Sequence, residues 1–160
     1  AVTAKLVETI HTVDHDRINV GIYGMRYLGD VLCDAGEHAL FYHLMTQPEY
    51  PGFGYMLKTG ATSLWEQWTY RGAMNSHNHA MFSGAASSVI TRLYGLELAP
   101  YGRPAVRIRP WMPEQGKFSC PFVQQRLPQG TIAYDWGRNR SLGDSVEVDI
   151  LSCPPYVTLE

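Results

Sequence analysis

Charged residues are scarce in this 160-residue sequence, and long apolar runs are missing. Charged side chains make up 18% of the chain, and 13 Lys and Arg against 15 Asp and Glu give a net charge of −2. Because no run of like charges occurs, we expect no nucleic-acid-binding surface. Because no run of about 18 to 20 apolar residues occurs, we expect no membrane span. The sequence therefore predicts a soluble protein and leaves its compartment open.

Cysteine is also rare. Cys33, Cys120 and Cys153 form no Cys-x-x-Cys pair and no cluster with histidine, which excludes the usual patterns of a zinc site or a disulfide framework. Asp14 and Asp16 flank a histidine, but this short pattern is more typical of a solvated turn than of a metal site. We therefore expect free thiols, no metal and no cofactor.

The residues that are present indicate two structural regimes. Hydrophobic residues make up 45% of the chain, enough for the core of one domain or of two small ones. All six histidines but only two of the ten prolines precede Leu96. We therefore divide the chain into residues 1–95 and residues 96–160.

The hydrophobic period changes at the same place. Before Leu96, apolar residues recur every three or four positions, which predicts helices near residues 2–10, 22–32 and 40–44 and a fourth at about 79–93. Ser76 or Asn78 could cap the fourth helix, and Gly95 could end it. After Leu96 the period is two, which predicts the strands of an antiparallel meander or half sandwich, with a turn at 128–130. The alternating residues are Val106 and Ile108; Phe118, Cys120 and Phe122; Ile132, Tyr134 and Trp136; and Val146, Val148 and Ile150.

The long connection between the third and fourth predicted helices, residues 47–77, is rich in aromatic residues. Connections of this length in compact domains usually carry function. Within it, Glu66 lies between Trp65 and Trp68, and a carboxylate beside indoles loses hydration and can take a proton from water. Glu66 is thus a candidate general base. The alternative is that both indoles are core anchors and that Glu66 is a capping or surface carboxylate.

Three ordered motifs in this region resemble a known family. They are Tyr50-Pro51-Gly52-Phe53-Gly54-Tyr55-Met56, then Gly60-Ala61-Thr62-Ser63-Leu64-Trp65-Glu66-Gln67-Trp68, and then Ser76-His77-Asn78-His79-Ala80-Met81-Phe82. Together they resemble the C-terminal part of the catalytic domain of bacterial α-L-rhamnosidases, glycoside hydrolase family 78. The sequence departs from the family pattern at Phe53, usually Trp, and at Ser63, usually Thr, and both changes keep the chemical type.

The resemblance implies an α+β fragment, in which the last helices of an (α/α)6 barrel are followed by an antiparallel β-sandwich region. It implies cleavage of terminal α-L-rhamnosyl linkages with inversion, with Glu66 as the general base and a rhamnose-containing glycan or glycoside as the substrate. It places Asn78 and His79 at the sugar. We expect further substrate contacts from three aromatic residues, Phe53, Trp65 and Trp68. The other histidines, His77 included, have no such support and are interpreted as structural or surface residues.

An inverting glycosidase needs two carboxyl groups, and this chain supplies one of them. We therefore expect the general acid in the remainder of a parent enzyme, and an isolated chain that is inactive. The apolar stripes of residues 22–32 and 82–93 predict self-association or cover by that remainder. Two alternatives stay open: another (α/α)6 sugar hydrolase or a phosphorylase, and a non-catalytic carbohydrate-binding or structural module.

Overall fold

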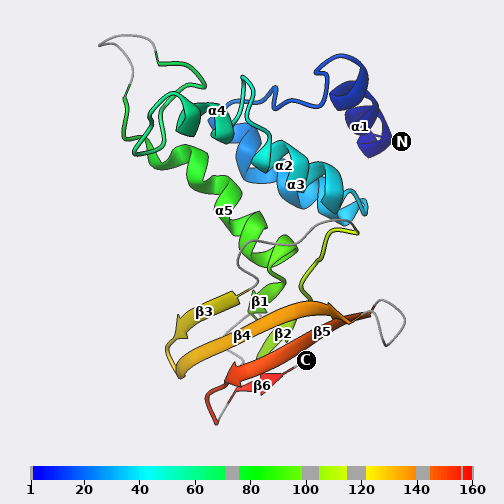
Figure 1. Ribbon diagram of the computed structural model, residues 1–160, viewed down its shortest axis with the longest axis vertical. Coiled ribbons are helices and arrows are strands. Elements are labelled where there is room, and N and C mark those ends of the chain that lie inside the picture. The colour runs from blue at the N-terminus through cyan, green and yellow to red at the C-terminus, as the bar shows by residue number, and fades with distance from the viewer. Residues whose placement is uncertain are drawn as a thin grey trace. The chain divides into compact units, whose positions relative to one another are not determined.

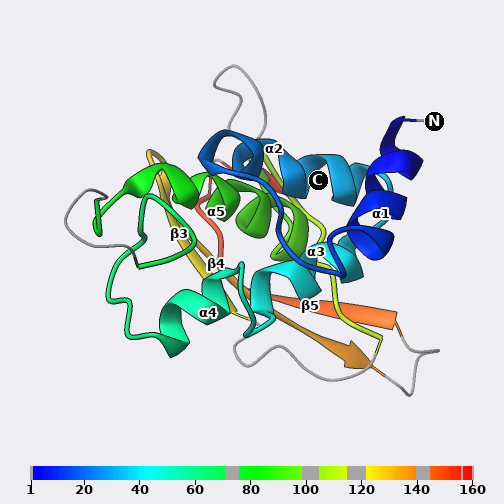
Figure 2. The ribbon, with the colours of Figure 1, turned by 90° about the horizontal axis from the view of Figure 1, so that it is seen from above.

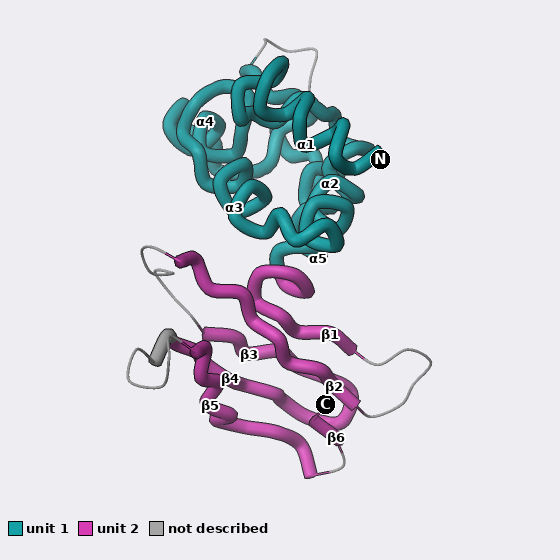
Figure 3. The backbone as a smooth tube through the Cα atoms, turned by 90° about the vertical axis from the view of Figure 1, so that its right-hand side faces the viewer, with its two compact units in different colours: residues 1–89 teal, residues 90–160 magenta. Residues whose placement is uncertain are grey.

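The computed structural model describes residues 2–70, 76–98, 105–114, 122–139, 145–155 and 157–159. They belong to two compact units, Ala1–Val89 and Ile90–Glu160, which Figure 3 colours separately. The first unit is helical, and the second contains all the described strands. The chain is therefore an α+β protein. The division into domains at Leu96 stays a prediction.

Three helices form where the apolar period predicts them: α1 (Val2–Thr12), α2 (Ile22–Asp34) and α3 (His38–Thr46). Helix α2 contacts both α3 and the later helix α5 (Gly84–Ser88), and Figures 1 and 2 show the three together. The buried side chains of these helices are mostly apolar and include Met25, Leu28, Leu32, Phe41, Leu44 and Ala85. The i, i+3, i+4 pattern of the sequence thus marks most of the buried face of α2, with Met25, Leu28 and Leu32, but Val31 of the same predicted stripe is 40% exposed.

Close approach of these helices depends on a glycine. A Cβ atom at Gly29 would lie 2.5 Å from the Ser88 Cβ and 2.6 Å from the Phe41 Cζ. Ser88 is fully buried, and its hydroxyl donates a hydrogen bond of 3.1 Å to Asp30 Oδ1. Because any side chain at Gly29 would push α3 or α5 outward, the packing of this layer requires glycine there.

The segment predicted as one helix at about 79–93 is a run of three different helical types. It contains the 3₁₀ turn η1 (Ala80–Ser83), then α5, then the π-helical turn η2 (Val89–Leu93). The expected side-chain cap is wrong, because His79 occupies the N-cap of η1 and makes no capping hydrogen bond. The structure also contains a short helix, α4 (Phe53–Lys58), in the connection whose glycines and prolines indicated only a loop.

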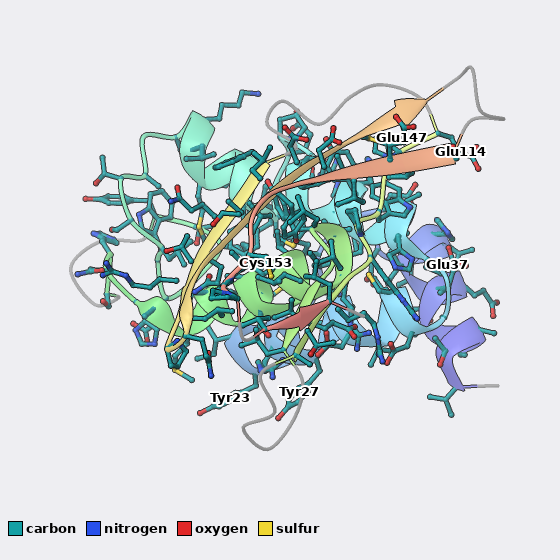
Figure 4. The ribbon with its side chains drawn as sticks, turned by 90° about the horizontal axis from the view of Figure 1, so that it is seen from below. Tyr23, Tyr27, Glu37, Glu114, Glu147 and Cys153 are labelled. Carbon is teal, nitrogen blue, oxygen red and sulfur yellow. The ribbon has the colours of Figure 1, made fainter. Side chains whose placement is uncertain are left out.

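Helix α2 also has an outer face that is exposed. Tyr23 is 75% exposed and Tyr27 65% exposed, and Figure 4 shows both side chains pointing away from the helix. In the second predicted apolar stripe, Phe82, Ala85 and Leu93 are buried, whereas Ala86 is exposed. The outer face of α2 therefore exposes more apolar surface than this stripe does. Self-association stays a prediction.

The second unit contains two three-stranded sheets. Strands β3 (Phe122–Leu127), β4 (Gly130–Asn139) and β5 (Ser145–Ser152) form the predicted antiparallel meander, with a tight turn between Leu127 and Gly130. In the other sheet β1 (Leu96–Leu98) pairs antiparallel with β2 (Ala105–Ile108), but β2 pairs parallel with β6 (Thr158–Leu159). The expectation of purely antiparallel pairing is therefore wrong. Phe118 and Cys120 lie outside the described residues.

One apolar cluster is shared by both sheets: Leu96, Val106, Leu127, Ile132, Tyr134 and Trp136. In β4 the predicted inward residues Ile132, Tyr134 and Trp136 are buried, although Ala133 between them is buried as well. In β5 the predicted inward face is wrong, because Val146 and Ile150 are 38% and 40% exposed. The Tyr134 hydroxyl donates a hydrogen bond of 2.7 Å to the Tyr94 carbonyl oxygen, and burial raises the pKa of this hydroxyl. Among the described residues, no helix is long and apolar enough to cross a membrane.

Substitution of Gly95 tests the packing of the second unit. Its φ is +76°, and an added Cβ would lie 2.1 Å from the Arg109 carbonyl carbon. Gly95→Ala should therefore lower the free energy of unfolding by about 2 to 4 kcal/mol, through both the left-handed backbone and the clash.

Gly36→Ala is the matched control, because Gly36 also has a positive φ of +88° but nothing within 4 Å of the added Cβ. The control should lose only about 1 kcal/mol. Urea denaturation followed by circular dichroism measures both losses. Equal losses would show that the contact with Arg109 is unimportant.

Candidate active site

The turn before α4 is built around a buried glutamine. Gln47 is 7% exposed; its Nε2 donates to the Pro51 carbonyl oxygen (2.9 Å), and its Oε1 accepts from the Glu49 N–H (2.8 Å). A Cβ atom at Gly54 would lie 2.5 Å from the Gln47 carbonyl oxygen, so the chain approaches too closely for a side chain there. This turn fixes the start of α4 and with it the position of Phe53.

The candidate base Glu66 is held by Ser76 in two ways. The Glu66 N–H donates to the Ser76 carbonyl oxygen at 2.9 Å, and the Ser76 N–H donates to Glu66 Oε2, also at 2.9 Å. Glu66 as a whole residue is half-buried, and the hydrogen bond of its carboxylate is exposed. Among the described residues, Ser76 is the donor that orients it. A backbone donor aimed at a carboxylate oxygen fixes the rotation of the side chain.

Two further hydrogen bonds join the residues just before Glu66 to the residues just after Ser76. The Ser63 hydroxyl donates to the His77 carbonyl oxygen, and the His79 N–H donates to the Leu64 carbonyl oxygen at 2.7 Å. Segments 63–66 and 76–79 therefore lie side by side. Residues from the second and third sequence motifs are in this way brought to one place.

Trp68 belongs to an aromatic cluster with Phe53 and Phe82. The Trp68 ring is 5.2 Å from the Phe53 ring and 4.1 Å from the Phe82 ring, measured between centroids. The indole Nε1 of Trp68 donates to the Val20 carbonyl oxygen at 2.8 Å. Trp68 is half-buried. It thus ties the loop to the residues just before α2 and to η1.

The second indole has a different environment. Trp65 is 4% exposed, and its ring contacts those of Tyr70 (5.5 Å) and His77 (5.9 Å). Tyr70 stacks on His77 with ring centroids 4.2 Å apart and an angle of 21° between the planes. Trp65 therefore behaves as a core anchor in this structure, and its role in binding substrate stays a prediction.

The structure thus brings the residues predicted for the site into two groups. Glu66, Asn78 and His79 are on the paired segments, and Phe53 and Trp68 contact each other. Asn78 is exposed, and His79 is half-buried. His77 joins this group although its position in the sequence gave no sign of it; the only available signal was its place inside the third motif. The described residues contain no group of three or more His, Cys, Asp or Glu that could hold a metal ion.

Comparisons with known proteins agree on one family. Residues 1–92 match the model described as bacterial alpha-L-rhamnosidase 6 hairpin glycosidase domain. An α-L-rhamnosidase of Formosa agariphila is 30% identical over 98% of this chain and 17% of its own length. Another from Streptomyces avermitilis is 29% identical over 100% of this chain and 16% of its own length.

Solved structures show the same likeness. An α-L-rhamnosidase structure from Dictyoglumus thermophilum superposes with a TM-score of 0.72 and 29% identity, over 85% of this chain and 15% of that one. The Streptomyces avermitilis α-L-rhamnosidase complexed with L-rhamnose superposes with a TM-score of 0.81 and 23% identity, over 98% of this chain and 15% of that one. The chain therefore spans about a sixth of the length of these relatives.

The anchoring of the loop through Trp68 can be tested by substitution. Trp68→Phe keeps a ring against Phe53 and Phe82 but removes the hydrogen bond to Val20. We expect the free energy of unfolding to fall by about 1 to 2 kcal/mol, because the Val20 carbonyl loses its donor.

Tyr70→Phe is the control, because Tyr70 is 64% exposed and the change keeps its ring. It should change the free energy of unfolding by less than about 0.5 kcal/mol. Urea denaturation of both variants measures the difference. A Trp68→Phe protein as stable as the control would mean that this hydrogen bond does not anchor the loop.

Proposed function

The chain belongs, over residues 1–92, to the bacterial α-L-rhamnosidase six-hairpin glycosidase domain family, and on this premise we propose that its parent protein is a glycoside hydrolase that removes terminal α-L-rhamnosyl residues from glycans or glycosides. The observation that carries the proposal is the double hydrogen bond between Glu66 and Ser76. It presents one oriented carboxylate on the same paired segments as Asn78 and His79.

The proposed reaction is hydrolysis with inversion at the anomeric carbon. Glu66 takes a proton from a water molecule, the water oxygen forms a bond to the anomeric carbon, and the bond to the leaving oxygen breaks. The leaving oxygen receives its proton from a general acid in the remainder of the parent enzyme. The Ser76 N–H holds Oε2, so Oε1 is the oxygen that accepts the proton from water.

The neighbouring residues bind the sugar in this proposal. His79 is held by the hydrogen bond of its N–H to Leu64, which fixes its backbone next to Glu66. Its imidazole and the Asn78 amide can each hydrogen-bond a sugar hydroxyl. The half-buried rings of Trp68 and Phe53 give an apolar surface on which a sugar ring can stack.

The proposal extends to the architecture of the parent. We assign residues 1–95 to the last helices of an (α/α)6 catalytic barrel and residues 96–160 to a C-terminal β-sandwich. The boundary between the two compact units, Ala1–Val89 and Ile90–Glu160, lies close to this division and supports it. The likeness of the chain to α-L-rhamnosidase structures supports this assignment. The two three-stranded sheets that share one apolar cluster are consistent with a sandwich.

The parent enzyme should release L-rhamnose from an aryl α-L-rhamnoside, with inverted configuration in the first-formed sugar. Proton NMR during the first minutes of the reaction distinguishes the two anomers. Retention would exclude a water-activating base in the role given to Glu66. A rhamnosyl phosphate formed only in phosphate buffer would indicate a phosphorylase instead.

Glu66→Gln in the parent should lower kcat by about 10² to 10⁴ while substrate still binds, because Gln keeps the size of the side chain but cannot accept the proton. Azide should restore turnover and give a glycosyl azide of inverted configuration, since the anion needs no base.

Glu8→Gln, on the exposed surface of α1, is the control and should leave kcat unchanged. Steady-state kinetics with and without azide measure all three enzymes. If Glu66→Gln keeps more than about a tenth of the wild-type rate, Glu66 is not the general base.

A further inference from the structure

The connection between α1 and α2, residues 13–21, is irregular but is fixed by its own contacts. Ile18 at its centre is 1% exposed, so the connection is anchored in the core. The Asn19 amide donates to Asp14 Oδ1 at 2.7 Å, and the Arg17 N–H donates to the Asp14 carbonyl oxygen at 3.1 Å. These contacts give the connection one defined path.

Two residues of this connection have an unfavourable backbone conformation. The φ angles of His15 and Asp16 are 52° and 58°, in the left-handed region that residues other than glycine rarely adopt. Asp16 is held there by its N–H, which donates to the Ile10 carbonyl oxygen at 2.9 Å, and by its Oδ1, which lies 2.5 Å from His11 Nδ1. A conformation of this kind persists only where the surrounding contacts determine it, and it is common near functional sites.

The same connection binds both ends of the loop that carries the candidate site. Arg17 Nη1 donates to the Tyr50 carbonyl oxygen at 2.7 Å, and the Val20 carbonyl oxygen accepts from Trp68 Nε1 at 2.8 Å. Arg17 and Val20 are close in the sequence, whereas Tyr50 and Trp68 are far apart in it. One short segment therefore sets the position of one end of the loop relative to the other.

The two ends of the loop carry the rings proposed to stack on the sugar. Phe53 closely follows Tyr50, at the start of α4, and its ring centroid lies 5.2 Å from that of Trp68. Gln47 holds the next carbonyl of this turn, that of Pro51, at 2.9 Å. A shift of the Tyr50 carbonyl would therefore move Phe53 relative to Trp68 and change the apolar surface that the two rings form.

The Arg17 side chain is the part of this link that substitution can remove most cleanly. Arg17 is exposed, and so is its hydrogen bond to Tyr50, so its loss opens no cavity in the core. A charged donor also makes a stronger hydrogen bond to a carbonyl oxygen than a neutral donor does. Removal of the guanidinium should thus loosen the turn while the helical core stays intact.

We propose that Arg17 is a positioning residue for substrate binding, which holds the Tyr50 turn so that Phe53 keeps its place against Trp68. This inference rests on the proposed function for the role of the two rings and the identity of the sugar. Arg17 acts through Phe53 and takes no part in proton transfer to Glu66. Its loss should therefore weaken substrate binding and leave the chemical step unchanged.

The first experiment measures amide hydrogen exchange by mass spectrometry in the 160-residue chain. Arg17→Met removes the donor, so exchange in peptides from residues 47–61 should become at least threefold faster, because the turn before α4 opens more readily. Arg126→Met, at an exposed position of β3, is the control and should leave this exchange unchanged. The same exchange rate in the wild type and both variants would overturn the proposal.

The second experiment measures the parent enzyme with an aryl α-L-rhamnoside. Arg17→Met should raise KM and the inhibition constant of free L-rhamnose at least threefold, with kcat within twofold of the wild type. Arg17→Lys should restore both constants to within twofold, because its ammonium group also donates to a carbonyl oxygen. Arg126→Met is again the control and should match the wild type.

A Phe53→Ala background shows whether Arg17 acts through Phe53. Arg17→Met should cause no further rise in KM there, because the ring that Arg17 positions is absent. An equal rise with and without Phe53, or a fall in kcat at unchanged KM, would show that Arg17 acts elsewhere and would refute its positioning role.

These results are separable from the proposed function. If the wild-type parent cleaves no rhamnoside, the proposed function fails, whereas the exchange rates still decide whether Arg17 holds the turn. If the wild type cleaves the rhamnoside and Arg17→Met leaves KM within twofold, only the positioning role fails.

Discussion

The pair of hydrogen bonds between Glu66 and Ser76 is the constraint on which the candidate site depends. One bond joins the two backbones, and the other orients the carboxylate, so the same residue sets both the path of the chain and the direction of the side chain. His77 and His79 take their places from this pair, since they lie one and three residues beyond Ser76. Support of this kind keeps a functional group in one geometry before any ligand binds.

The loop that carries Glu66 is in turn tied to the helical layer. Trp68 donates to the Val20 carbonyl just before α2, and its ring lies against Phe82 of η1. These helices pack closely because Gly29 lacks a side chain. A long connection can therefore hold its functional residues as firmly as a helix would, although its own backbone is irregular.

Local patterns predicted the parts of the fold that local forces determine. Helices α1, α2 and α3 and the β3–β4–β5 meander follow from hydrophobic period and a two-residue turn. The sequence did not predict the parallel pairing of β2 with β6 or the 3₁₀ and π turns around α5, because tertiary contacts decide both. The sequence also did not predict α4, because its segment is rich in glycine and proline. The hydrogen bonds of the buried Gln47 side chain fix the turn that precedes this helix.

Sequence patterns likewise predicted the candidate site only in part. Motif order placed Glu66 and His79 together, but only the folded chain separates the two indoles, with Trp65 at 4% exposure and Trp68 half-buried. The Trp68 N–H already donates to the Val20 carbonyl, so of this side chain only the ring face remains for the substrate contact that we propose. The sequence shows neither that hydrogen bond nor the burial of Trp65, because both depend on residues that only the folded chain brings close to the indoles.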